Sequence, residues 1–72
     1  MNTISISLDR NDWGQIVEGL EARRASWEGT VRYLEGEEVD QLIEDCRDAE
    51  EARAVAATYD RLIGELCRQL RL

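Results

Sequence analysis

Acidic side chains are the residues of this sequence best suited to chemistry, and most of them fall in one short window. Residues 35–51 hold nine acids and one base, a net charge of −8, whereas the whole 72-residue chain has a net charge of −7. Carboxylates at this density suit a face for a basic protein partner, a mimic of nucleic-acid phosphate or a carboxylate metal site. The alternative without a ligand is a solvated surface that keeps a small domain soluble. The candidate partner-binding face comprises Glu35, Glu37, Glu38, Asp40, Glu44, Asp45 and Asp48.

The composition excludes several kinds of active site. The chain has no histidine and only two cysteines, so it offers no histidine-dependent catalysis and no zinc site of the usual ligands within one chain. A calcium-binding EF-hand that started at Asp40 would need glycine at its sixth position, where the sequence has Asp45. We therefore expect no cofactor and no metal. Cys46 and Cys67 fall on apolar helical stripes and are predicted to be buried free thiols.

Two acidic pairs have a spacing that could gather four carboxylates around Mg²⁺. Glu18 and Glu21 form one pair at i, i+3, and Glu37 and Asp40 form the other. On neighbouring helices, such pairs could hold the metal that binds a nucleotide phosphate. This pattern resembles that of the all-α NTP pyrophosphatases and covers four residues. The resemblance implies Mg²⁺-dependent pyrophosphate release as one alternative function.

The N-terminal residues have the alternating pattern of a half-buried strand. Apolar Ile4, Ile6 and Leu8 alternate with polar residues over positions 3–8, and no other segment has this period. A single strand leaves its backbone donors and acceptors unpaired, so it needs a second strand. We therefore predict that this strand pairs with its copy in a second chain, as a two-stranded ribbon across a homodimer axis.

A shared strand followed by helices resembles the ribbon-helix-helix repressors. In that family the outward side chains of the ribbon read the major groove of DNA, and here those would be Thr3, Ser5 and Ser7. The sequence departs from the family because the ribbon carries no arginine or lysine and the domain is acidic. Phosphate neutralisation supplies most non-specific affinity for DNA, so this departure disfavours DNA as a partner.

A long helix is predicted after the strand. Asp9 is a suitable N-cap, and Gly36 is a suitable stop in the left-handed conformation. Apolar residues recur between them at intervals of seven, at Trp13, Leu20, Trp27 and Leu34. Arg24 occupies a position where this stripe needs an apolar residue. The helix is therefore either continuous, with Arg24 extending past the core, or broken near Ser26.

Two further helices are predicted in the second half of the chain. Residues 37–46 place apolar side chains at i, i+3, i+4 and i+7, which predicts a short acidic amphipathic helix. Asp48 is a suitable N-cap for a last helix over residues 49–69. Its apolar stripe begins with Ala52 and ends with larger residues such as Leu66, so we expect its partner to approach most closely near Ala52.

These patterns predict a mainly α single domain over residues 1–72. It consists of an N-terminal β-strand, a long helix, a short acidic helix and a long C-terminal helix, arranged as a helical hairpin with an intersubunit two-stranded ribbon. The chain has no run of about 20 apolar residues that could span a membrane and no secretory signal, so we expect a cytoplasmic location. All basic residues are arginine, a usage that suggests a GC-rich bacterial genome.

The function expected from these features is that of a small non-enzymatic interaction or regulatory protein of a bacterium, phage or mobile element. A core this small usually gains help from staples or from a partner subunit, and the apolar stripes are wider than one hairpin needs, which again favours a homodimer. A ribbon-helix-helix-like DNA-binding regulator and a pyrophosphatase-like enzyme are the alternatives.

Overall fold

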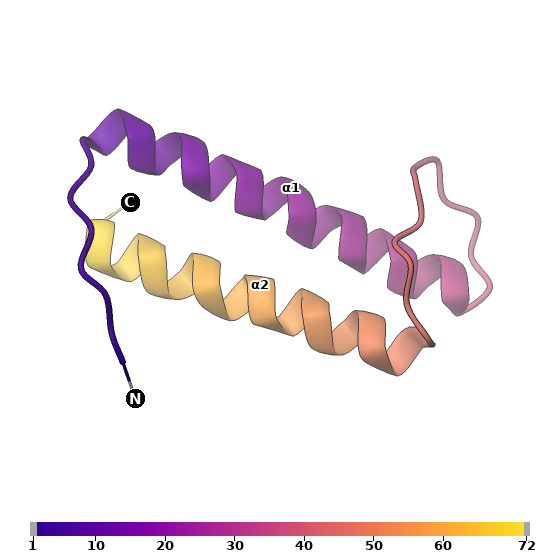
Figure 1. Ribbon diagram of the computed structural model, residues 1–72. Helices are drawn as coiled ribbons and strands as arrows, with labels where there is room; N and C mark the ends of the chain where they lie inside the picture. The colour runs from indigo at the N-terminus through magenta and orange to yellow at the C-terminus, as the bar shows by residue number, and fades with distance from the viewer. Residues whose placement is uncertain (1, 72) are drawn as a thin grey trace.

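The chain folds as a hairpin of two antiparallel helices. The computed structural model describes residues 2–71, with α1 spanning Arg10–Leu34 and α2 spanning Ala49–Leu70 (Figure 1). A loop over residues 35–48 joins the helices, and the residues before α1 run as an extended segment across the C-terminal end of α2. The predicted mainly α helical hairpin is thus confirmed. Within residues 2–71, neither helix is long and apolar enough to cross a membrane.

Both ends of α1 are fixed by the residues predicted to fix them. The Asp9 carboxylate accepts hydrogen bonds from the backbone N–H groups of Asn11, at 2.8 Å, and Asp12, at 3.1 Å. At the other end, Gly36 has a φ of +97°, which suits glycine because it lacks a Cβ. The N–H groups of Gly36 and Glu37 bond back to the carbonyls of Tyr33 and Arg32, which is the Schellman arrangement that satisfies the last carbonyls of a helix.

The helix α1 is continuous through Arg24 and Ser26, which decides between the two predicted alternatives. The Arg24 side chain is only 30% exposed, and its guanidinium reaches an oxygen of Asp60 on α2 at 3.1 Å. The aliphatic stem therefore crosses the apolar stripe while the charge is paired at its edge. Ser26 caps no second helix. Its carbonyl instead accepts hydrogen bonds from Thr30 and Gln41.

The helix α2 matches its prediction within one residue. It begins after Asp48, whose carboxylate accepts a hydrogen bond of 2.9 Å from the backbone N–H of Glu51. The side chain of Glu51 pairs with Arg47 at 2.7 Å. The cap and the acidic first turn suit the positive end of the helix dipole, so local sequence accounts for this boundary.

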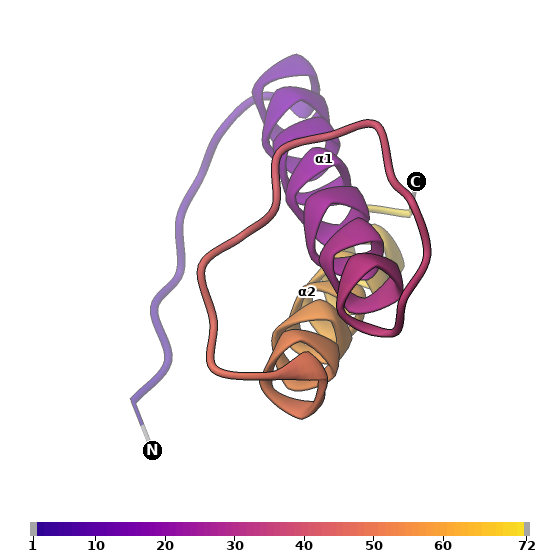
Figure 2. The same cartoon turned by 90° about the vertical axis from the view of Figure 1, so that its right-hand side faces the viewer.

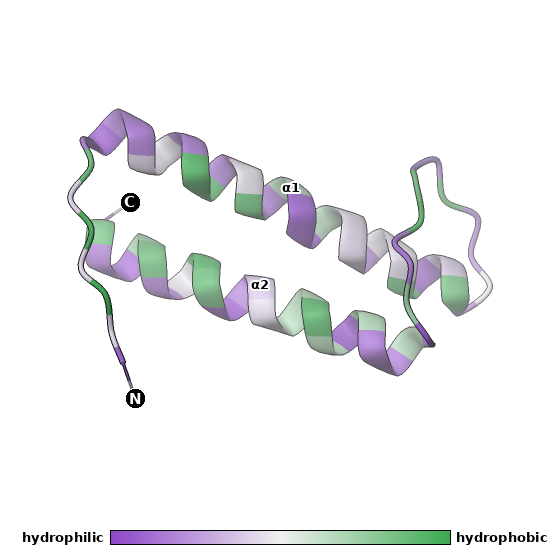
Figure 3. Cartoon of the chain, viewed as in Figure 1, coloured by the Kyte–Doolittle hydropathy of each residue, from purple (hydrophilic) through white to green (hydrophobic). Residues whose placement is uncertain are grey.

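The core between the helices is small. Its buried members are Val17, Trp27, Ala52 and Ile63, with Thr30 as the buried polar residue. Ala52 is fully buried, and the helices diverge from this end toward the start of α1 and the end of α2 (Figure 2). The close approach expected near Ala52 is therefore present. Figure 3 shows apolar residues along the facing sides of both helices and in the extended N-terminal segment.

The predicted N-terminal strand is absent from this single chain. Residues 3–8 are extended, but no strand occurs within residues 2–71 and no backbone hydrogen bond ties this segment to the rest of them. The physical reason is that a strand needs a second strand to bond with, and the remainder of the chain is helix and loop. A ribbon shared between two copies would need the strand of a second chain.

The predicted short acidic helix over residues 37–46 is also wrong, because this segment is loop throughout. Its five acids include Glu44 and Asp45 near the end where a helix dipole favours cations, and Asp40 lies one turn before Glu44. A helix of ten residues is marginal without strong packing. The apolar side chains of the segment gain little burial, since Leu42 is 90% exposed and Ile43 36%.

Candidate interaction surfaces

The segment 35–48, which we call the acidic loop, is docked on α1. It leaves the end of α1, passes around that helix and descends on the other side to the start of α2 (Figure 2). The Thr30 hydroxyl, fully buried, donates to the Ser26 carbonyl at 2.8 Å and accepts the backbone N–H of Glu44 at 3.0 Å. The Gln41 amide donates to the same Ser26 carbonyl at 2.9 Å. These bonds give a loop without secondary structure a defined position.

Gly29 makes room for this docking. A Cβ at Gly29 would overlap the side-chain amide of Gln41, whereas a Cβ at Gly14, Gly19 or Gly64 would meet nothing. Ser26, Gly29 and Thr30 thus form a small, polar patch at i, i+3 and i+4 on α1. This patch was not predicted from the sequence. The small residues next to Trp27 in the sequence could have indicated that another segment packs closely against α1 there.

Two of the seven predicted acidic face residues form ion pairs inside the chain. Glu44 pairs with Arg23 on α1 at 2.8 Å, and Glu35 pairs with Arg53 on α2 at 2.7 Å. The Tyr59 hydroxyl, through hydrogen bonding, and then the charge of Glu44 raise the pKa of Arg23 above its ordinary value. The acidic loop is therefore tied to both helices by charge as well as by Thr30.

The other five acids of the predicted face divide into a cap and an outward group. Asp48 caps α2. The other four are exposed and form no ion pair among the described residues, and they are Glu37, Glu38, Asp40 and Asp45. The negative charge offered to solvent by the acidic loop thus comes from these four residues, carried on a docked backbone.

The structure does not gather the carboxylates of the pyrophosphatase-like pattern. Glu18 and Glu21 are exposed on α1, and Glu37 and Asp40 are exposed on the acidic loop. Within residues 2–71, no three histidine, cysteine, aspartate or glutamate side chains are placed to hold a metal ion.

The surroundings of Cys46 do not favour a nucleophile. Cys46 and Cys67 are half-buried and form no disulfide. Burial, followed by the negative charges of Glu51, Asp45 and Asp48, raises the pKa of the Cys46 thiol. The thiolate is the reactive form, so this environment makes Cys46 less reactive than an ordinary thiol.

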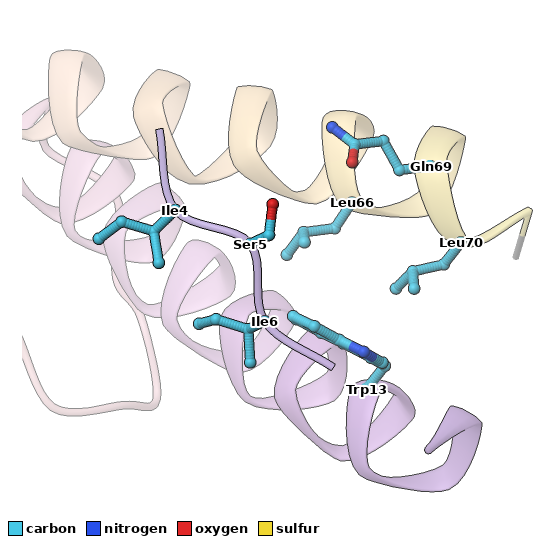
Figure 4. A pocket seen from close by; sticks show the side chains of 7 residues that line it. All are labelled: Ile4, Ser5, Ile6, Trp13, Leu66, Gln69 and Leu70. Atoms are coloured by element: carbon cyan, nitrogen blue, oxygen red, sulfur yellow. The ribbon is translucent and has the colours of Figure 1, made fainter. Parts of the chain in front are cut away.

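The extended N-terminal segment covers a cavity between the diverging helix ends. The cavity measures about 410 Å³ and is lined by Ile4, Ser5, Ile6, Trp13, Leu66, Gln69 and Leu70 (Figure 4). Ile4 and Ile6 project from one side of the segment and Ser5 from the other, so the alternation predicted from the sequence is kept. The predicted ribbon residues remain largely unburied: Ile4 is 85% exposed, Ile6 62% and Leu8 42%.

One side of the hairpin, which we call the open face, carries further exposed apolar residues. Ile16 on α1 is 41% exposed, and Leu62 on α2 is 37% exposed. Ile16 lies two helical turns from Arg23, and Leu62 lies one turn from Tyr59. Arg23 hydrogen-bonds to Tyr59 and pairs with Glu44, so Ile16 and Leu62 lie on the side of the hairpin that carries this pair. Figure 2 shows the N-terminal segment and the descending part of the acidic loop on this side. The open face therefore extends between these two segments.

No known protein family, curated protein or solved structure matches the chain.

Proposed function

We propose that this chain is a small, non-enzymatic interaction module that acts as a homodimer and presents its acidic loop to a basic protein partner. Residues 3–8 of the two copies pair as an antiparallel ribbon in this proposal. The main support for this proposal is the apolar surface that a single hairpin leaves exposed. This surface lies on segments apart from the four outward acids of the acidic loop.

The total surface of the chain supports association. It amounts to 5738 Å², whereas a compact monomeric protein of 8.3 kDa has about 4,600 Å². The radius of gyration is 14.3 Å, against about 11 Å for a compact domain of this length. The difference in area is about 1,100 Å², and each partner in a standard interface contributes about 800 Å². One dimer interface of standard size would therefore cover most of the surplus.

The unpaired backbone of residues 3–8 supports a ribbon. An antiparallel pairing around a two-fold axis places residues of equal parity opposite each other, so that Ile4 and Ile6 face isoleucines or Leu8 of the other copy. A shift by one residue would set apolar side chains against serines. The ribbon would give this segment the hydrogen bonds that the single chain does not provide.

The geometry of the acidic loop supports a second, basic partner. Glu37, Glu38, Asp40 and Asp45 point to solvent on a backbone that Thr30 holds in place. A docked acidic segment loses less conformational entropy on binding than a free one, because much of its order exists beforehand. The four carboxylates lie on a segment of the chain apart from residues 3–8, so a ribbon leaves them accessible.

The ribbon-helix-helix alternative requires the serine side of the ribbon to face outward. In this chain Ser5 lines the cavity together with Ile4 and Ile6, so the serine side of the segment is not set apart as an outward face. The four outward carboxylates would also repel phosphate. Retention on duplex DNA at about 50 mM salt would favour this alternative over the proposal.

The ribbon is tested by the mass of the protein in solution and one proline variant. Light scattering at micromolar concentration should give twice the chain mass of 8.3 kDa. Ile6→Pro removes a ladder donor and should shift the mass toward the monomer, whereas Asn2→Pro, outside the ribbon, should not. A monomer mass for the unaltered protein would refute the proposed dimer.

The acidic loop is tested with charge-neutral variants. A quadruple variant, Glu37→Gln, Glu38→Gln, Asp40→Asn and Asp45→Asn, should lose proteins that the unaltered chain captures from a host extract. Glu18→Gln with Glu21→Gln removes acids from α1 and should retain those proteins. Equal capture by the two variants would contradict a role for the loop.

A further inference from the structure

We infer that the open face of the hairpin is the main contact between the two copies, so that the dimer is a four-helix arrangement in which the ribbon covers one end. This inference rests on the proposed homodimer and assigns a surface and an occupant to it. It names Ile16 of α1 and Leu62 of α2 as the helical residues that the second copy covers.

The open face collects apolar side chains from three segments. On α1, Ile16 aligns with Arg23, because seven residues return a helix to the same side. On α2, Leu62 lies between Tyr59 and Leu66, and Leu66 lines the cavity under the N-terminal segment. Ile4 and Ile6 project from that segment on the side toward the middle of the hairpin (Figure 4). These residues therefore border one continuous surface.

Charge favours a second copy as the occupant. The chain carries −7, so two copies repel each other unless they meet where charge is low. Arg23 and Glu44, which lie on the open face, neutralise each other at 2.8 Å. The four outward acids lie on the acidic loop instead. A basic partner gains little from a Glu44 carboxylate that is already paired, whereas a second apolar face of the same kind gains the burial of both surfaces.

Area and symmetry favour the same occupant. The surplus of about 1,100 Å² is larger than the roughly 800 Å² that one partner contributes to a standard interface, so it leaves room for helical residues beside the ribbon. A two-fold axis through the ribbon also brings the same surface of each copy to the contact, as an isologous interface requires. The helical residues next to the ribbon are therefore the ones placed to complete the dimer interface.

The test replaces two residues that a single hairpin already leaves partly exposed. Ile16→Gln with Leu62→Gln should raise the dimer dissociation constant by about 100-fold, or about 2.8 kcal/mol, because each change counts twice in a symmetric dimer. The matched control is Leu34→Gln, which has the same 41% exposure as Ile16 but lies at the far end of α1. This control should leave the dissociation constant unchanged. Sedimentation across a dilution series measures all three proteins, and circular dichroism checks that each remains helical.

A thiol-reactivity measurement avoids any dependence on the folding of the double variant. In a background of Cys46→Ser and Cys67→Ser, Ile16→Cys should react slowly with an aqueous maleimide at high concentration and rapidly on dilution. Leu34→Cys should react rapidly at both concentrations.

The outcomes separate the inference from the proposed function. Loss of the dimer in the open-face variant, with concentration-dependent protection at position 16, supports the inference. A dimer that survives the double substitution, or a thiol at position 16 that reacts equally at all concentrations, overturns it and leaves the ribbon dimer standing. A monomer for the unaltered protein overturns both.

Discussion

Replacing Thr30 with valine should release the acidic loop from α1. Valine keeps the shape of threonine and has nearly the same helix propensity, so the change removes the hydroxyl alone. Ser26 loses little, because its carbonyl still accepts the Gln41 amide at 2.9 Å. The backbone N–H of Glu44, however, loses its acceptor at 3.0 Å in a partly buried position. The variant therefore tests a single hydrogen bond to the loop.

The expected size of the effect follows from that one unsatisfied donor. A buried donor left without a partner costs about 1–3 kcal/mol, and the partial burial of this site places the loss at about 1–2 kcal/mol. For a domain of this size, each kcal/mol lowers the melting temperature by about 4–8 °C. Amide hydrogen exchange at Glu44 should accelerate as well, because the docked loop opens more often.

The chain supplies a matched control at Thr58. Its hydroxyl also donates to the carbonyl four residues earlier, Ala54, at 3.1 Å, but it is exposed and no loop docks on it. Thr58→Val should therefore change the free energy of unfolding by less than about 0.5 kcal/mol. Thermal unfolding at one fixed protein concentration compares the two variants. Equal melting temperatures, or unchanged exchange at Glu44, would refute the reasoning.

Three further predictions concern the helices. Gly19→Ala should raise the free energy of unfolding by about 0.5–1 kcal/mol, because a Cβ there meets nothing. Gly29→Ala should raise it less, because a Cβ there displaces the side-chain amide of Gln41. Thermal unfolding of the two variants checks this difference. Asp48→Ala should lose about 0.5–2 kcal/mol with the N-cap of α2, and an unchanged midpoint in urea would contradict the cap. Hydrogen bonds from Arg68 and then Gln69 lower the pKa of Glu65 from 4.5 to about 2. The stability that this pair contributes is complete above pH 4.5 and is lost as the pH falls toward 2, so Glu65→Gln should flatten the acid dependence of the melting temperature across that window.

Much of the fold was predictable because local chemistry determines it. Asp9, Gly36 and Asp48 fix helix boundaries through hydrogen bonds within a few residues, and such bonds can be read from sequence. The stripe of α2 also predicted its packing, with Ala52 fully buried at the narrow end.

The acidic segment was not predictable in the same way. Its spacing of apolar residues matched a helix, but the segment is loop, because the bonds that hold it come from Thr30, Arg23 and Arg53, far away in sequence. The sequence shows where the acids are concentrated. Which of them form ion pairs and which face solvent depends on tertiary contacts. The predicted N-terminal strand is absent for a related reason, since a strand needs a second strand to bond with and residues 2–71 contain none.

The most direct test of the proposed homodimer is the mass of the unaltered protein, measured by sedimentation equilibrium over micromolar concentrations. The proposal predicts twice the chain mass of 8.3 kDa, with dissociation on dilution. A mass of 8.3 kDa at every concentration would show that a single hairpin tolerates its exposed apolar face, and it would contradict both the ribbon and the open-face contact.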